Sequence, residues 1–96
     1  MAAYLLFART AITDEEKSKR YGELVIPQIR AFGGEVVATR AVPRLLEGDW
    51  QPMALTVLKF ADMDALMTWY ESEEYAPLKR MRLESNTGDI FVIEGN

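Results

Sequence analysis

The sequence predicts a small α+β domain in which the elements follow one another as strand, helix, strand, strand, helix, strand. Three observations predict this order. Apolar runs of strand length open and close the chain, two further β-prone runs lie in its middle, and two segments between these runs repeat apolar residues at helical spacing. Such an order folds as a ferredoxin-like βαββαβ sandwich, an antiparallel four-stranded sheet with both helices on one face. We expect one such domain over residues 1–96.

The first part of the chain predicts a strand followed by a long helix. The run AYLLFA, residues 3–8, is short and aromatic, as suits a buried strand. In the stretch TDEE, Thr13 is placed to cap a helix over about residues 14–32, and the acidic residues favour its positive end. Pro27 lies inside this helix and predicts a kink, because proline removes one hydrogen bond. Gly33 follows the helix and suits a positive φ.

The second part predicts two strands, a helix and a closing strand. EVVATRA (35–41) and MALTVLKF (53–60) read as strands joined by a hairpin. RLLEG reads as the continuation of EVVATRA or as a short strand after a break at Pro43, and EGDWQP forms the turn. Asp62 is placed to cap a helix in ADMDALMTWYE. A short helical segment over about 77–84 and a last strand, DIFVIEG (89–95), complete the chain.

Both faces of the predicted sheet are apolar. Successive strand residues point to opposite faces, yet the first strand has Leu5 and Phe7 on one face and Tyr4 and Leu6 on the other. Two helices cover one face only, and the other would exceed the few hundred Å² (order of magnitude) that a soluble monomer leaves open. We therefore expect a homodimer that packs sheet against sheet about a two-fold axis. The alternative is a monomer with a half-exposed sheet.

Charge and composition exclude several classes of function. The formal net charge of −4 opposes binding to nucleic acid, and ALTVLKF lacks the paired aromatic and basic residues of RNA-recognition strands. No stretch approaches the roughly 20 apolar residues of a membrane span, so we expect a cytoplasmic protein. Without cysteine or histidine, thiolate nucleophiles, histidine bases and the usual zinc sites are excluded. The acidic clusters lie at helix starts, where they are expected, and we predict no metal and no cofactor.

Several stretches of the chain resemble a known family. AFGGEVV, LLEGDWQP, LKFADMDALMTWYESEEYAPLKRMR and IFVIEG are similar to domain of unknown function family number 1330, which belongs to the dimeric α+β barrel superfamily. The resemblance implies a ferredoxin-like protomer and a dimer whose two sheets form a barrel, but no established reaction. Proteins with this barrel include cofactor-independent monooxygenases, muconolactone isomerases and haem-binding peroxidases. This chain has no histidine to bind haem, and Ala61 stands where the family commonly has proline.

Candidate site residues gather in the segment WYESEEYAPLKRMR. Tyr70 belongs to the apolar stripe of the second helix and is predicted to be core, whereas Trp69 lies beside that stripe and is predicted to border a cleft. Tyr75 and Arg82 are seven residues apart, two turns along one helical face, and together could hold an acidic or phenolic ligand. The alternative is that Tyr75 packs and Arg82 pairs with a surface carboxylate.

Glu47 and Trp50 lie at the predicted hairpin turn. Turn chemistry explains the glycine and aspartate between them but not a large indole, so Trp50 is expected to contact something. If Glu47 lies against that ring and out of water, its affinity for a proton rises and it could act as a general base. The alternative is that Glu47 forms an ion pair with an arginine.

The combined expectation is a small-molecule pocket between sheet and helices in each protomer of the dimer. Its predicted lining is Tyr21, Trp50, Trp69 and Tyr75, with Glu47 and Arg82 as polar contacts. Such a site could isomerise or oxidise an aromatic or enolisable compound without a cofactor. The competing hypothesis is a non-catalytic dimer that binds a metabolite or a protein. Convergence of Glu47 and Arg82 inside an apolar cavity would favour the enzyme.

Overall fold

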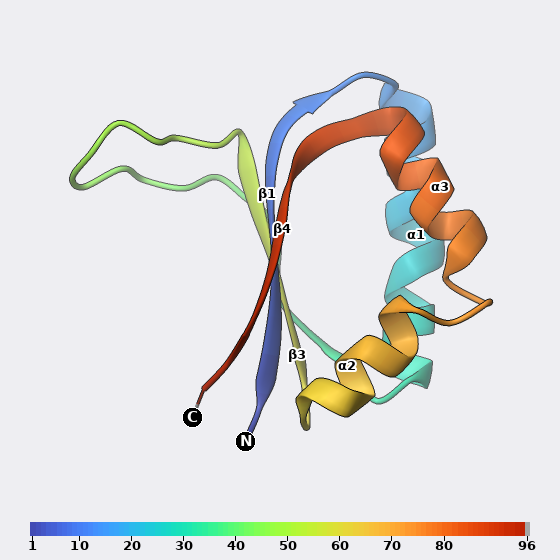
Figure 1. The fold of residues 1–96 in the computed structure, drawn as a ribbon. Helices are drawn as coiled ribbons and strands as arrows, with labels where there is room; N and C mark the ends of the chain where they lie inside the picture. Colours follow the sequence, from blue (N-terminus) through green and yellow to red (C-terminus); the bar gives the residue numbers. More distant parts are fainter. Residues whose placement is uncertain (96) are drawn as a thin grey trace.

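The structure, a computed structural model that describes residues 1–95, has a four-stranded antiparallel sheet in the order β2-β3-β1-β4 with its helices on one face (Figure 1). The predicted ferredoxin-like βαββαβ fold is confirmed, with α3 as an added short helix before the last strand. The elements are β1 (Ala3–Ile12), α1 (Glu15–Ala31), β2 (Glu35–Ala41), β3 (Ala54–Phe60), α2 (Met63–Tyr70), α3 (Ala76–Ser85) and β4 (Asn86–Glu94).

The first strand is longer than the sequence predicts. Residue 8 was the expected end, but β1 stays paired with β4 as far as Ile12, across a register shift between Arg9 and Ala11. The apolar run does stop at residue 8, whereas backbone pairing continues because β4 begins at Asn86 and supplies partners for the polar extension. The extension matters for the site, because it makes Arg9 a strand residue on the same face as Phe7.

The start of α1 lies one residue later than predicted. Asp14 is the N-cap, and its Oδ1 accepts a hydrogen bond from the Lys17 backbone N–H at 3.0 Å. Thr13 is not the cap, because its backbone N–H donates to the Ser85 carbonyl oxygen at 2.9 Å and holds Thr13 at the end of the preceding strand region. The helix then continues through Pro27 to Ala31. The predicted cap of α2 is confirmed, since Asp62 accepts from the Ala65 N–H at 2.8 Å.

The connection between β2 and β3 is a long projecting loop rather than a tight hairpin. We call residues 42–53 the arm; it leaves the sheet on the side away from the helices (Figure 1). Both predictions for RLLEG, as the continuation of the strand and as a short strand after Pro43, were wrong, because no strand lies between Ala41 and Ala54. Pro43 and Pro52 lack the N–H groups that a sheet ladder needs, and Gly48 takes a positive φ of 97°. Leu46 is 83% exposed on the arm.

The core lies between the sheet and the helices, and α2 is turned differently from the prediction. Trp69 is buried, with 1% of its surface exposed, and stacks on Phe60 at a centroid distance of 5.7 Å. Tyr70 is only partly buried. The burial of these two rings is therefore the reverse of the prediction, although Trp69 also lines the cavity described below. In a helix of only eight residues the apolar stripe fits more than one face, and Leu66 with Trp69 forms the buried one.

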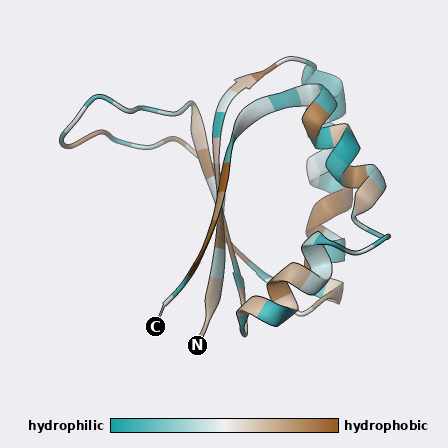
Figure 2. Cartoon of the chain, viewed as in Figure 1, coloured by the Kyte–Doolittle hydropathy of each residue, from teal (hydrophilic) through white to brown (hydrophobic). Residues whose placement is uncertain are grey.

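The outer face of the sheet carries exposed apolar side chains, as predicted. The helices all lie on the other side of the sheet (Figure 2). On β4, Phe91 is 49% exposed and Ile93 is 52% exposed. Their register partners on β1, Leu6 and Tyr4, are partly buried on the same face. Trp50 of the arm lies edge-on to Phe91 with ring centroids 6.5 Å apart. Within residues 1–95, no helix is long and apolar enough to span a membrane.

Candidate functional site

A cavity of about 60 Å³ lies between the inner face of the sheet and helix α1. Its wall is mostly apolar, with contributions from β1, β3 and α1, and its inner end is formed by the turn between α2 and α3. Four of the six predicted site residues line it, namely Tyr21, Trp69, Tyr75 and Arg82. Tyr75 and Arg82, whose spacing predicted a shared helical face, therefore both lie in the wall of this cavity.

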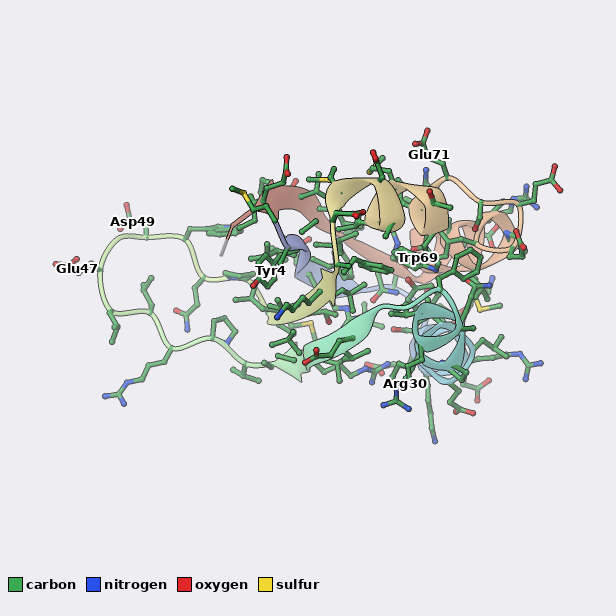
Figure 3. The ribbon with its side chains drawn as sticks, turned by 90° about the horizontal axis from the view of Figure 1, so that it is seen from below. Tyr4, Arg30, Glu47, Asp49, Trp69 and Glu71 are labelled. Carbon is green, nitrogen blue, oxygen red and sulfur yellow. The ribbon has the colours of Figure 1, made fainter. Side chains whose placement is uncertain are left out.

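The other two predicted site residues lie elsewhere. Glu47 and Trp50 are exposed on the arm, where they line a separate open hollow of about 410 Å³. Figure 3 shows Glu47 at the tip of the arm, on the opposite side of the molecule from Trp69. Glu47 and Arg82 do not converge within one protomer, because the arm carries Glu47 away from the helices. The general-base role of Glu47 gains no support from its position.

A hydrogen-bond chain runs along one side of the cavity from Arg82 through Tyr75 to Tyr21. Arg82 Nε donates to the Tyr75 hydroxyl oxygen at 3.2 Å, and the hydroxyls of Tyr75 and Tyr21 are 2.9 Å apart. Tyr75 is 1% exposed, and either of the two hydroxyls can be the donor in this contact. Whichever of them donates, one of the two hydroxyl hydrogens is left for an acceptor in the cavity, which both tyrosines line.

The turn before α3 holds this chain in place. The Tyr75 backbone N–H donates to Ser72 Oγ at 3.1 Å, and that hydroxyl in turn donates to the Trp69 carbonyl oxygen at 2.7 Å. The Tyr75 ring lies 4.3 Å from the Trp69 ring, and Trp69 Nε1 donates to Gln28 Oε1 at 3.0 Å. Because each aromatic ring is fixed by packing and by a polar contact, the Tyr75 hydroxyl is positioned before any ligand arrives.

Sequence reasoning missed two arginines of the site, Arg9 and Arg40. Arg9 is 5% exposed, and its Nε has no hydrogen-bond partner among residues 1–95. Its guanidinium lies 5.3 Å from the centre of the Phe7 ring, and that of Arg82 lies 5.5 Å from the same ring. The sequence does carry a signal for Arg9, because Ala3, Leu5, Phe7 and Arg9 alternate onto one strand face. A strand predicted to end at residue 8 leaves Arg9 out of this pattern.

Arg40 reaches the cavity from a distorted part of β2. Its φ of 51° is in the left-handed region, and the pairing of β2 with β3 shifts register between Ala38 and Ala41. Arg40 Nη2 donates to the Ser18 carbonyl oxygen of α1 at 3.3 Å. Bulges redirect side chains next to functional sites. The alternating pattern of EVVATRA does not predict the bulge at Arg40.

The cavity shifts the ionisation of its polar groups. Burial and the nearby positive charge of Arg40 lower the pKa of Arg9. Burial also acts to lower the pKa of Arg82, but Tyr75 and Tyr21 outweigh it and the pKa is raised. Burial and the neighbouring Tyr75 raise the pKa of Tyr21 well above 10.0. At neutral pH the site is therefore a cluster of cations and neutral hydroxyl donors.

The raised pKa of Tyr21 predicts a pH dependence of stability. In the unfolded chain Tyr21 loses its proton near pH 10, while in the folded protein it stays protonated. Above pH 10 the folded state binds more protons, so stability falls with pH by about 1.4 kcal/mol per unit for this group. Tyr21→Phe should make the fall in the free energy of unfolding shallower by that slope in denaturant titrations at pH 10–11. Equal slopes in both proteins would show that Tyr21 titrates alike in both states.

Among residues 1–95, no group of three or more acidic side chains is placed to hold a metal ion. The cavity lining offers guanidinium and hydroxyl groups rather than carboxylates, which is a donor set for an anion and not for a hard cation. The chemistry that this arrangement can perform is recognition of negative charge and stabilisation of a developing oxyanion.

Three solved structures resemble this chain along nearly all of its length. A protein of unknown function from Rhodopseudomonas palustris has a TM-score of 0.75 at 17% identity, with 99% of this chain and 82% of that chain covered. SnoaB, a cofactor-independent oxygenase from Streptomyces nogalater, has a TM-score of 0.57 at 12% identity, with 99% and 92% covered. A dimeric ferredoxin-like protein of unknown function from Bacteroides fragilis has a TM-score of 0.53 at 11% identity, with 98% and 95% covered.

At these identities the likeness to the solved structures shows the fold alone. No curated protein matches the chain. The match to a family is more direct, because residues 2–96 fit the family described as Domain of unknown function (DUF1330). The resemblance found in the sequence is thereby confirmed, and the chain belongs to the DUF1330 family.

Proposed function

We propose that this protein is a homodimer that binds a small organic molecule in the cavity beneath each sheet. The observation that carries the proposal is the chain from Arg82 through Tyr75 to Tyr21, which leaves one tyrosine hydroxyl hydrogen to donate into the cavity. Inside a mostly apolar wall, a few fixed polar groups of this kind orient a ligand and give specificity. The size of the cavity, about 60 Å³, suits a compact molecule.

Binding to the cavity is tested by a thermal-shift screen of small metabolites with the wild-type protein and Tyr75→Phe. We expect at least one compound to raise the wild-type Tm and to raise it less in the variant, because the variant breaks the chain that orients Tyr21. Tyr4→Phe, on the outer sheet face, is the matched control and should respond like wild type. Compounds that act equally on all three proteins, or no active compound, would contradict the proposal.

The dimer is supported by the exposed apolar face of the sheet and by the arm beside it. Phe91, Ile93 and Trp50 expose about half of their surfaces there, and a second copy of the same face would cover them. The structural relative from Bacteroides fragilis is described as dimeric. Removing two such faces from water also enlarges the buried fraction of a chain whose own core is small.

Introducing one charge into this face should separate the protomers. We expect light scattering at micromolar concentration to give twice the chain mass of 10.9 kDa for the wild type and a single chain for Ile93→Glu. The matched control is Leu83→Glu, which changes an equally exposed apolar residue on α3, on the helical side of the molecule, and should remain dimeric. A monomeric wild type would contradict the dimer. A dimer that survives Ile93→Glu would place the interface elsewhere.

A second candidate function is cofactor-independent conversion of the bound molecule. It is favoured by the same hydrogen-bond chain, because a charge-assisted donor such as Tyr21 can stabilise an enolate oxygen. Binding alone ranks first because the cavity lining, among residues 1–95, contains no carboxylate base. Exchange of pyruvate methyl protons in D₂O, followed by NMR, distinguishes the two: exchange above the buffer rate that Tyr21→Phe abolishes indicates catalysis.

A further inference from the structure

The cavity carries three arginines and no acidic side chain. Arg9, Arg40 and Arg82 all line it, and no aspartate or glutamate does so among residues 1–95. The protein as a whole is acidic, with a formal net charge of −4, so this local excess of positive charge is opposite to the global balance. Low-dielectric walls focus such a field into the cavity and attract a solute of negative charge.

Arg9 is buried without a complete set of hydrogen-bond partners. Its side chain is 95% removed from solvent, since 5% of its surface is exposed, yet Nε has no partner among residues 1–95. Buried guanidinium groups are normally paired, because all their N–H groups are donors and desolvation is costly. The acid that acts on Arg9 is Glu15, at the start of α1, and it is the weakest influence on the Arg9 pKa and forms no part of the cavity.

Arg40, an exposed residue of β2, reaches the same cavity from a strained backbone position. A non-glycine residue with a φ of 51° occupies a costly conformation, and such conformations cluster at functional sites. Its approach also lowers the pKa of Arg9, which shows that the two like charges act on each other. Two repelling guanidinium groups held at one cavity are stabilised together when one anion lies between them.

We propose that the natural ligand is a small organic acid whose carboxylate is bound by Arg9 and Arg40. This inference rests on the proposed binding function and names its substrate class. The planar fork of arginine matches a carboxylate, and the hydroxyl hydrogen that the Tyr21–Tyr75 contact leaves over adds a further donor. The mostly apolar wall takes the hydrocarbon part of the acid, whereas a free phosphate would need polar partners on every side. The volume admits an acid of roughly five or six non-hydrogen atoms.

The test compares molecules of one shape that differ in charge. Isobutyrate and its amide, isobutyramide, are matched in size, and inorganic phosphate serves as the anion without an apolar part. Calorimetry with the wild-type dimer should show isobutyrate binding about tenfold more tightly than isobutyramide, and phosphate more weakly than isobutyrate. Equal affinity for acid and amide would overturn the carboxylate assignment while leaving the cavity a binding site. A preference for phosphate, or no binding of any probe, would also overturn it.

Three variants separate a ligand-binding role from a structural one. Arg9→Met and Arg40→Gln should each remove the preference for isobutyrate, while affinity for isobutyramide stays unchanged. Arg9→Met should also raise the Tm of the ligand-free protein, because a buried charge without a counter-ion is replaced by an apolar chain. Arg80→Gln, exposed on α3, is the control and should keep the preference. A lower Tm for Arg9→Met together with an intact preference would assign Arg9 to structure alone.

Discussion

Replacing Trp69 with alanine is expected to lower the free energy of unfolding by about 3–5 kcal/mol, one of the largest effects of any single change in this chain. Trp69 is 1% exposed and touches three other rings, stacking on Phe60 at 5.7 Å and lying 4.3 Å from Tyr75 and 6.2 Å from Tyr70. Its Nε1 also donates to Gln28 Oε1 at 3.0 Å, so truncation leaves that side chain without its donor. The loss of stability combines the free energy of transferring the removed ring to water with the cost of the cavity that it leaves in the core.

Denaturant unfolding at one fixed protein concentration measures this effect, since association contributes to the stability of a dimer. The matched control is the neighbouring Tyr70→Ala, which removes an aromatic ring from the same helix but from a partly buried position. We expect the control to cost clearly less. A Tyr70→Ala loss equal to or larger than that of Trp69→Ala would restore the assignment made from the helical stripe and contradict the observed packing.

The sequence was sufficient for the architecture because its strongest signals are local or periodic. The strand run at residues 3–8, the cap at Asp62 and the order of the elements each depend on neighbours along the chain. The two-sided apolar character of the strands likewise follows from alternation alone. The reversed burial of Trp69 and Tyr70 shows the limit, because a two-turn helix has too few residues for its period to select one face.

The candidate site was half predictable for a related reason. Tyr75 is the N-cap of α3 and Arg82 lies within that helix, so their spacing predicted a shared face, on which Arg82 Nε donates to the Tyr75 hydroxyl oxygen at 3.2 Å. Arg9 and Arg40 come to one cavity through sheet pairing, a register shift and a strained φ, and the sequence carries a signal only for Arg9, in its alternation with Leu5 and Phe7. For Glu47 the sequence predicted a site residue that the structure places away from the cavity. Turn-forming residues do not reveal whether a loop is short or projects as an arm.

The second large effect is expected at Gly88, where alanine should cost about 3 kcal/mol of stability and also disturb the arginine site. Gly88 pairs with Arg9 across β1 and β4. An added Cβ would clash with the Ala8 carbonyl oxygen, and would lie 2.8 Å from Phe7 Cε1 and 2.9 Å from Arg9 Cα. Two of these atoms are backbone, so relief requires β4 to move away from β1 rather than a side chain to rotate.

Separating β4 from β1 at this point removes the support of the β1 segment that carries Phe7 and Arg9, which both line the cavity. We therefore expect Gly88→Ala to lower the Tm by roughly 12 °C or more and to weaken isobutyrate binding in the protein that remains folded. Gly95→Ala, with no atom within 4 Å of its added Cβ, is the control and should change the Tm little. A Gly88→Ala protein with wild-type Tm would mean that β1 and β4 are farther apart here than the structure shows. The position of Arg9 beside the cavity would then be contradicted as well.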